Sequence, residues 1–127
     1  MQNKARPKYL NLFTLGAKMS VTAKVSILHR VSGILLVLSL PILLYILQRS
    51  LLSADFYSVL YGCFSNPIVK LIYLVLIWAF IYHVCSGVRF LFLDISRGVE
   101  VKIAQKTARI VIVLSIILTI IMGWIIW

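Results

Sequence analysis

The chain has 127 residues, of which 62% are hydrophobic, and its thirteen basic residues far outnumber its three acidic ones. A soluble domain of this length cannot hide so much apolar surface, so the composition excludes an ordinary soluble fold. The basic residues border apolar runs instead of forming a separate patch, so the charge does not indicate nucleic-acid binding.

Three charge-free runs, each eighteen residues long, are the main signal along the chain, and they lie at 31–48, 71–88 and 110–127. Each run approaches the length that a helix needs to cross a bilayer. The predicted fold class is therefore an all-α membrane protein with three transmembrane helices.

We expect one membrane domain over residues 1–127, opened by a basic segment at 1–20 that lies along the inner membrane surface. The transmembrane helices are predicted at about 24–49, 67–93 and 106–127. Asn66 before Pro67 is a good start signal for the second helix, and the connector before it has room for a short helix. Most basic residues precede the first span or follow the second, so the positive-inside rule places the N-terminus inside. No cleavable signal peptide is expected.

Four residues at the inner end of the first span are Ser26, His29, Arg30 and Gly33. The last three follow Ser26 by three, four and seven residues, so all four lie on one helix face. An arginine alone at this depth typically extends its charge toward the lipid headgroups. That role requires neither the serine nor the histidine beside it, so the combined face indicates a binding site.

The second span contains a histidine, His83, with Gly87 and Asp94 on the same face. A titratable side chain within a membrane span is costly and marks a functional site by default. A glycine one turn away leaves room beside the imidazole for a flat cofactor such as a porphyrin. A histidine that hydrogen-bonds to a neighbouring helix explains the pattern equally well. Asp94 is expected to pair with Arg97 or Arg30.

The two histidines are not expected to ligate one iron together. His83 precedes Arg89 by six residues, which places it about 9 Å deeper than the inner boundary, whereas His29 lies at that boundary. A haem would therefore need its second ligand from another subunit. Cys63 and Cys85 are interpreted as small apolar residues, and two cysteines cannot hold an iron–sulfur cluster.

Two stretches resemble the cytochrome b subunit of succinate dehydrogenase. Ser26-x-x-His29-Arg30-x-Ser32-Gly33 is similar to the family signature S-x-x-H-R-x-[ST]-G. His83-x3-Gly87-x-Arg89 with Asp94 resembles the second signature, H-x3-G-x-R-H-x3-D, although Phe90 replaces its second histidine. The stretch that begins at Arg6-Pro7 is similar to the family's N-terminal R-P-x-x-x-x-L. The likeness covers nearly the whole chain.

The resemblance implies an anchor that pairs with a second small hydrophobic subunit in a heterodimeric helix bundle. This pair would share haem b, bind ubiquinone, and dock an iron–sulfur subunit and a flavoprotein subunit on the inner side. By position, His83 matches the axial ligand of the haem iron, His29 and Arg30 match residues near the haem propionates, and Ser26 and Arg30 match residues at the quinone site. Without flavin or iron–sulfur machinery, the chain would have no catalytic activity alone.

The expected function is electron transfer from succinate oxidation to quinone, in the respiratory chain and the tricarboxylic acid cycle. The alternatives are a fumarate reductase anchor, a small proton-coupled transporter that uses His83 and Asp94, and an assembly or anchor protein with no cofactor. The short basic N-terminus favours a bacterial inner membrane over a mitochondrial one. Membrane lipids are expected partners, and nucleic acid is not.

Overall fold

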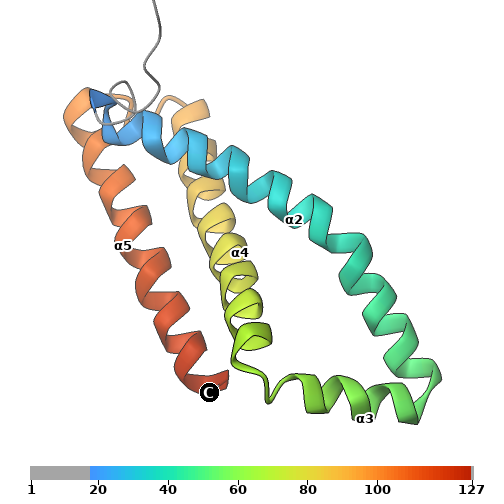
Figure 1. Ribbon diagram of the computed structural model, residues 1–127. Coiled ribbons are helices and arrows are strands. Elements are labelled where there is room, and N and C mark those ends of the chain that lie inside the picture. The colour runs from blue at the N-terminus through green and yellow to red at the C-terminus, as the bar shows by residue number, and fades with distance from the viewer. Residues whose placement is uncertain (1–17, 127) are drawn as a thin grey trace, which may run out of the picture.

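The computed structural model describes residues 18–126, and this part of the chain is helical between short turns, with no strand (Figure 1). Its helices are α2 (Val21–Leu52), α3 (Ala54–Cys63), α4 (Pro67–Asp94) and α5 (Val101–Ile126). Helices α2, α4 and α5 are long and apolar enough to cross a membrane. The predicted all-α class with three spans is therefore confirmed. Most of the basic segment predicted over 1–20, including the Arg6-Pro7 stretch, lies outside the described residues.

Side chains at the start of two long helices satisfy backbone N–H groups that the first helical turn leaves unpaired. Ser20 Oγ accepts a hydrogen bond from the amide of Ala23 before α2. Asn66 Oδ1 accepts one from the amide of Ile68 at 2.9 Å, directly before the proline that opens α4. Helix α5 begins at Val101, five residues before the predicted span, because its polar first turns are also helical.

The three long helices meet at one end of the molecule. Helices α4 and α5 lie side by side, whereas α2 crosses them near its start and then diverges, so that α3 bridges the far end (Figure 1). A small core at the meeting point consists of Val25, Tyr82, Ala108 and Val111. The hydroxyl of Tyr82 donates a hydrogen bond to the carbonyl of Val25 at 3.0 Å, which ties α4 to α2.

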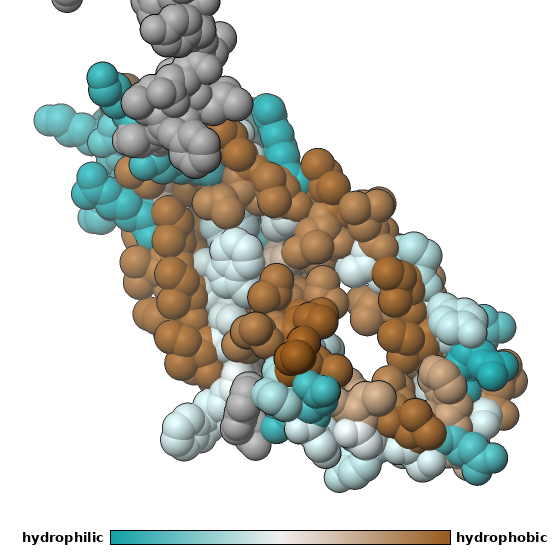
Figure 2. Space-filling model, in the orientation of Figure 1, coloured by the Kyte–Doolittle hydropathy of each residue, from teal (hydrophilic) through white to brown (hydrophobic). Residues whose placement is uncertain are grey.

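The second half of α2 stands apart from the other spans. Leu38 and Leu51 on this half are 66% and 78% exposed. Figure 2 shows apolar residues over most of the face in view and an open gap on the α2 side. Apolar surface of this extent needs lipid or another subunit to cover it.

Candidate functional site

The two histidines of the described chain lie against each other where α2 crosses α4. The ring centroids of His29 and His83 are 4.1 Å apart, and the ring planes differ by only 12°. The prediction that these residues lie at different depths is therefore wrong. It used Arg89 as a marker of the membrane boundary, but Arg89 is only 6% exposed and lies inside the bundle.

Each histidine ring lies against a glycine of the opposite helix. His83 on α4 faces Gly33 on α2, and His29 on α2 faces Gly87 on α4. A Cβ atom added to Gly33 would lie 3.0 Å from Cε1 of His83, and one added to Gly87 would lie 3.6 Å from Nε2 of His29. The space beside Gly87, in which one of the two interpretations of the sequence placed a cofactor, therefore holds the ring of His29. The two H-x3-G spacings allow the helices to approach closely enough for the rings to stack.

Hydrogen bonding fixes the protonation pattern of the His83 ring. Its Nδ1 lies 3.2 Å from the carbonyl oxygen of His29 and 3.1 Å from Oγ of Ser32. The hydroxyl of Ser32 donates its own proton to the same carbonyl at 2.8 Å. A carbonyl oxygen only accepts hydrogen bonds, so Nδ1 of His83 carries the ring proton. In the neutral form of the ring, the lone pair is therefore on Nε2.

This arrangement leaves His83 Nε2 able to bind a metal ion, and it prevents the two histidines from binding one metal ion together. Stacked rings present their faces to each other, whereas an iron–imidazole bond lies in the ring plane, along the nitrogen lone pair. No iron can therefore sit between His29 and His83. A metal bond to His83 Nε2 leaves the stack undisturbed, and a hydrogen bond at Nδ1 typically orients a ligating histidine. Within residues 18–126 there is no group of three or more potential metal ligands.

The other predicted site residues lie near the histidine pair without closing a pocket around it. Ser26 is half-buried one turn before His29 on α2, and Arg30 is exposed next to it. The structure brings neither side chain into a hydrogen bond with another described residue. Asp94 is exposed and forms no ion pair with described residues, so its predicted pairing with Arg97 or Arg30 is wrong.

Sequence reasoning missed the structural role of Arg89, which it treated as a charge at the membrane boundary. The guanidinium Nε donates to Oγ1 of Thr107 at 3.1 Å, and Nη2 donates to the carbonyl of Ala104 at 3.1 Å. Its Nη1 is buried and has no partner among the described residues. Arg89 thus fastens α4 to the first turns of α5. Its place in the second signature was the only sequence feature that set it apart from the other basic residues.

Phe90, which departs from the second signature, lies between the ring of His29 and the guanidinium of Arg89. Its ring packs against His29 with centroids 5.2 Å apart, and the guanidinium of Arg89 lies 5.3 Å from the same ring. An aromatic ring is well suited to both neighbours, since it covers an imidazole and attracts a cation. Phe90 therefore fills the position of the missing histidine by packing and without a polar atom.

Comparison with known proteins completes the description of the site. The family model for the succinate dehydrogenase/fumarate reductase transmembrane subunit matches residues 2–122. A protein of Rickettsia felis, named succinate dehydrogenase cytochrome b556 subunit, is 33% identical over 80% of this chain and 79% of its own length. A protein of the same name from Coxiella burnetii is 33% identical over 83% of this chain and 85% of its own length. The resemblance seen in the two signatures is thus confirmed, and the chain belongs to the family of transmembrane subunits of succinate dehydrogenase and fumarate reductase.

Proposed function

We propose that this chain is the haem b- and ubiquinone-binding anchor subunit of a succinate dehydrogenase. The observation that carries the proposal is the His83 ring, whose Nδ1 proton is held by the carbonyl of His29 at 3.2 Å. This leaves Nε2 as a lone-pair donor within a membrane-spanning helix. The cytochrome b names of the relatives from Rickettsia felis and Coxiella burnetii agree with such a ligand.

The residues present fit one side of a haem. His83 would hold the iron through Nε2, and the carbonyl of His29 and the hydroxyl of Ser32 would orient the imidazole. The exposed guanidinium of Arg30 and the ring of His29 would face the propionates at the basic end of the bundle. When bound, haem supplies a one-electron carrier whose potential depends on its axial ligands and its burial.

A further residue to hold the haem iron would come from a second small hydrophobic subunit. The stacked geometry excludes His29 from this role, and the described chain has no third histidine. The exposed second half of α2 and the gap beside it offer an apolar surface against which that subunit would pack. The basic end of the bundle would face the iron–sulfur and flavoprotein subunits, which would carry out succinate oxidation.

Ubiquinone would bind near Ser26 and Arg30 at the same end. Both residues lie on α2, one turn apart, and their side chains have no hydrogen-bond partner among residues 18–126. A hydroxyl and a guanidinium can both donate hydrogen bonds to a quinone carbonyl, and the cation would stabilise negative charge that develops on its oxygen. The two residues would therefore bind and polarise the quinone at the membrane surface.

The relatives favour succinate oxidation over fumarate reduction, although the family description includes both directions. The proposed location is a bacterial inner membrane, because the relatives from Rickettsia and Coxiella are bacterial proteins. The quinone that copurifies with the complex tests the direction. Ubiquinone supports succinate oxidation, and a low-potential quinone would support fumarate reduction.

The quinone assignment is tested by comparing two electron acceptors in the purified complex. Arg30→Ala should lower succinate-driven ubiquinone reduction by at least about tenfold, since one lost donor at a developing charge often costs more than that. Succinate-driven reduction of a soluble dye should stay near the level of the unmodified complex. Arg97→Ala, which removes an exposed arginine elsewhere at the same end, should leave both rates unchanged. Equal loss of both rates in Arg30→Ala would contradict a quinone-binding role.

A further inference from the structure

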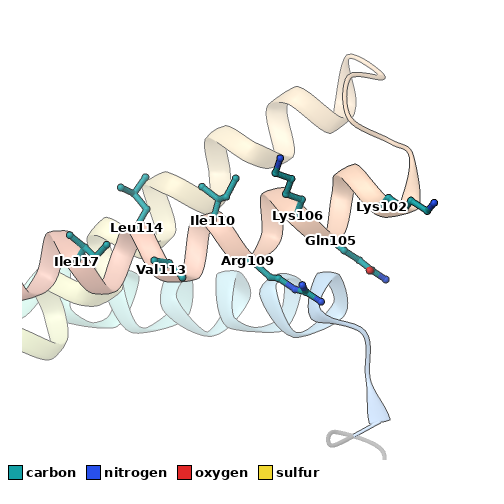
Figure 3. A pocket seen from close by; sticks show the side chains of 8 residues that line it. All are labelled: Lys102, Gln105, Lys106, Arg109, Ile110, Val113, Leu114 and Ile117. Carbon is teal, nitrogen blue, oxygen red and sulfur yellow. The ribbon is translucent and has the colours of Figure 1, made fainter.

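The outward side of α5 carries a groove in which charged and apolar residues are separated along the helix. Figure 3 shows the polar side chains at the end nearest the turn from α4, and the apolar ones further along α5. The groove has a volume of about 630 Å³. Its polar part consists of Lys102, Gln105, Lys106 and Arg109, and its apolar part consists of Ile110, Val113, Leu114 and Ile117.

This groove, hereafter the α5 groove, lies on the opposite side of the helix from the protein core. The buried residues of α5 are Ala108, Val111, Ser115 and Thr119. None of them lines the groove, and its three cations are all exposed. The groove therefore faces outward from the three described spans, where a membrane protein meets lipid.

The positive charge of the α5 groove favours binding of an anion. Lys102, Lys106 and Arg109 are spaced four and three residues apart, so they lie along one helix face. The chain has only three acidic residues, and none of them lines the groove within the described part. Basic sites at the charged end of transmembrane helices attract anionic lipid headgroups.

The apolar part of the groove has the length of a lipid chain in one leaflet. Ile117 follows Arg109 by eight residues, which corresponds to about 12 Å along the helix axis. Half of a bilayer hydrocarbon core is about 15 Å thick. A headgroup bound to the cations would therefore place an acyl chain directly along Ile110 to Ile117.

We propose that the α5 groove is a binding site for an anionic phospholipid. The phosphate contacts the side chains of Lys102, Lys106 and Arg109, and Gln105 hydrogen-bonds to the headgroup. One acyl chain packs along the apolar residues toward Ile117. This site is separate from the histidine pair, and it stands whether or not the proposed electron-transfer function is correct.

Lipid binding to the intact complex tests the proposal. Native mass spectrometry measures how many molecules of phosphatidylglycerol and of phosphatidylcholine the complex retains from an equimolar mixture. Each basic residue near an anionic membrane surface contributes about fivefold in affinity, so removal of three should reduce the preference for phosphatidylglycerol by more than about tenfold. The groove variant carries the substitutions Lys102→Gln, Lys106→Gln and Arg109→Gln.

Two further variants separate a defined site from general attraction. The control variant removes the same charge from exposed residues at the same end, outside the groove, through Lys18→Gln, Lys24→Gln and Arg97→Gln. It should keep the preference of the unmodified complex within about twofold, because none of the three substituted residues lines the groove in which the lipid would be bound. The charge-preserving variant should also keep it, and it carries Lys102→Arg, Lys106→Arg and Arg109→Lys.

Three outcomes would overturn the proposal. Equal loss of preference in the groove and control variants would show that net charge alone attracts the lipid. An unchanged preference in the groove variant would show that these cations bind no lipid. Loss of the soluble subunits from the groove variant, with its lipid preference intact, would show that the groove docks a protein instead.

Discussion

Replacement of Gly33 by alanine tests whether the close approach of α2 and α4 holds the His83 ring in place. The added Cβ would lie 3.0 Å from Cε1 of His83 and 3.5 Å from its Nδ1. Ordinary carbon–carbon contacts lie at about 3.5 to 4.0 Å, so the ring would have to move by several tenths of an ångström. It cannot move freely, because it stacks on His29 and its Nδ1 is hydrogen-bonded to the His29 carbonyl.

The same change at Gly87 is the matched control. Its added Cβ would lie 3.6 Å from Nε2 of His29, which is an ordinary contact. Both substitutions gain the same helix propensity, at most about 1 kcal/mol, so this contribution cancels in the comparison. Overpacking at Gly33 should then make Gly33→Ala less stable than Gly87→Ala by about 1 to 3 kcal/mol, or about 5- to 150-fold in the unfolding equilibrium.

Unfolding of the purified complex in mixed micelles with a denaturing detergent measures this difference. We expect Gly33→Ala to unfold at a lower detergent fraction than Gly87→Ala, and to retain less haem at every fraction. Equal stability of the two variants, or a more stable Gly33→Ala, would refute the close contact between Gly33 and His83.

Three further substitutions test hydrogen bonds made by Tyr82, Arg89 and Ser32. Tyr82→Phe removes a buried hydrogen bond to the backbone of α2 and should lower the free energy of unfolding by about 1 kcal/mol; an unchanged unfolding curve would contradict that bond. Arg89→Gln removes two bonds to α5 and should destabilise the complex by about 2 to 5 kcal/mol, whereas Arg97→Gln at an exposed position should have no effect. Ser32→Ala should shift the midpoint potential of the haem while its content stays the same, since His83 keeps one of its two Nδ1 partners; an unchanged potential would contradict the contact.

The fold was predictable because the three spans depend on local properties of the chain. Hydropathy alone located α2, α4 and α5, and the cap at Asn66 fixed the start of α4. The identity of the family was also readable, because both signatures are short and local. The start of α5 was predicted too late, since a polar turn outside the hydrocarbon gives no hydropathy signal.

The contact between the histidines was not predictable in the same way. Relative depth depends on how α2 crosses α4, and the crossing depends on the glycines that lie opposite the rings. It also depends on which arginine marks the membrane surface. Arg89 follows a charge-free run, as a boundary residue would, yet the packing of the helices buries it between α4 and α5. Sequence spacing along one helix carries no such information about its neighbour.

The absorbance spectrum of the reduced complex tests the central claim most directly, namely that His83 Nε2 is an axial ligand of haem b. Spectra of the unmodified complex, His83→Ala and His29→Ala should be compared after the assembly of each complex has been verified. We predict that His83→Ala assembles without the haem b band. His29→Ala should retain that band, because it removes the stacked ring and its proposed propionate contact but keeps the backbone carbonyl that orients His83. An assembled His83→Ala complex with an unchanged spectrum would contradict the claim.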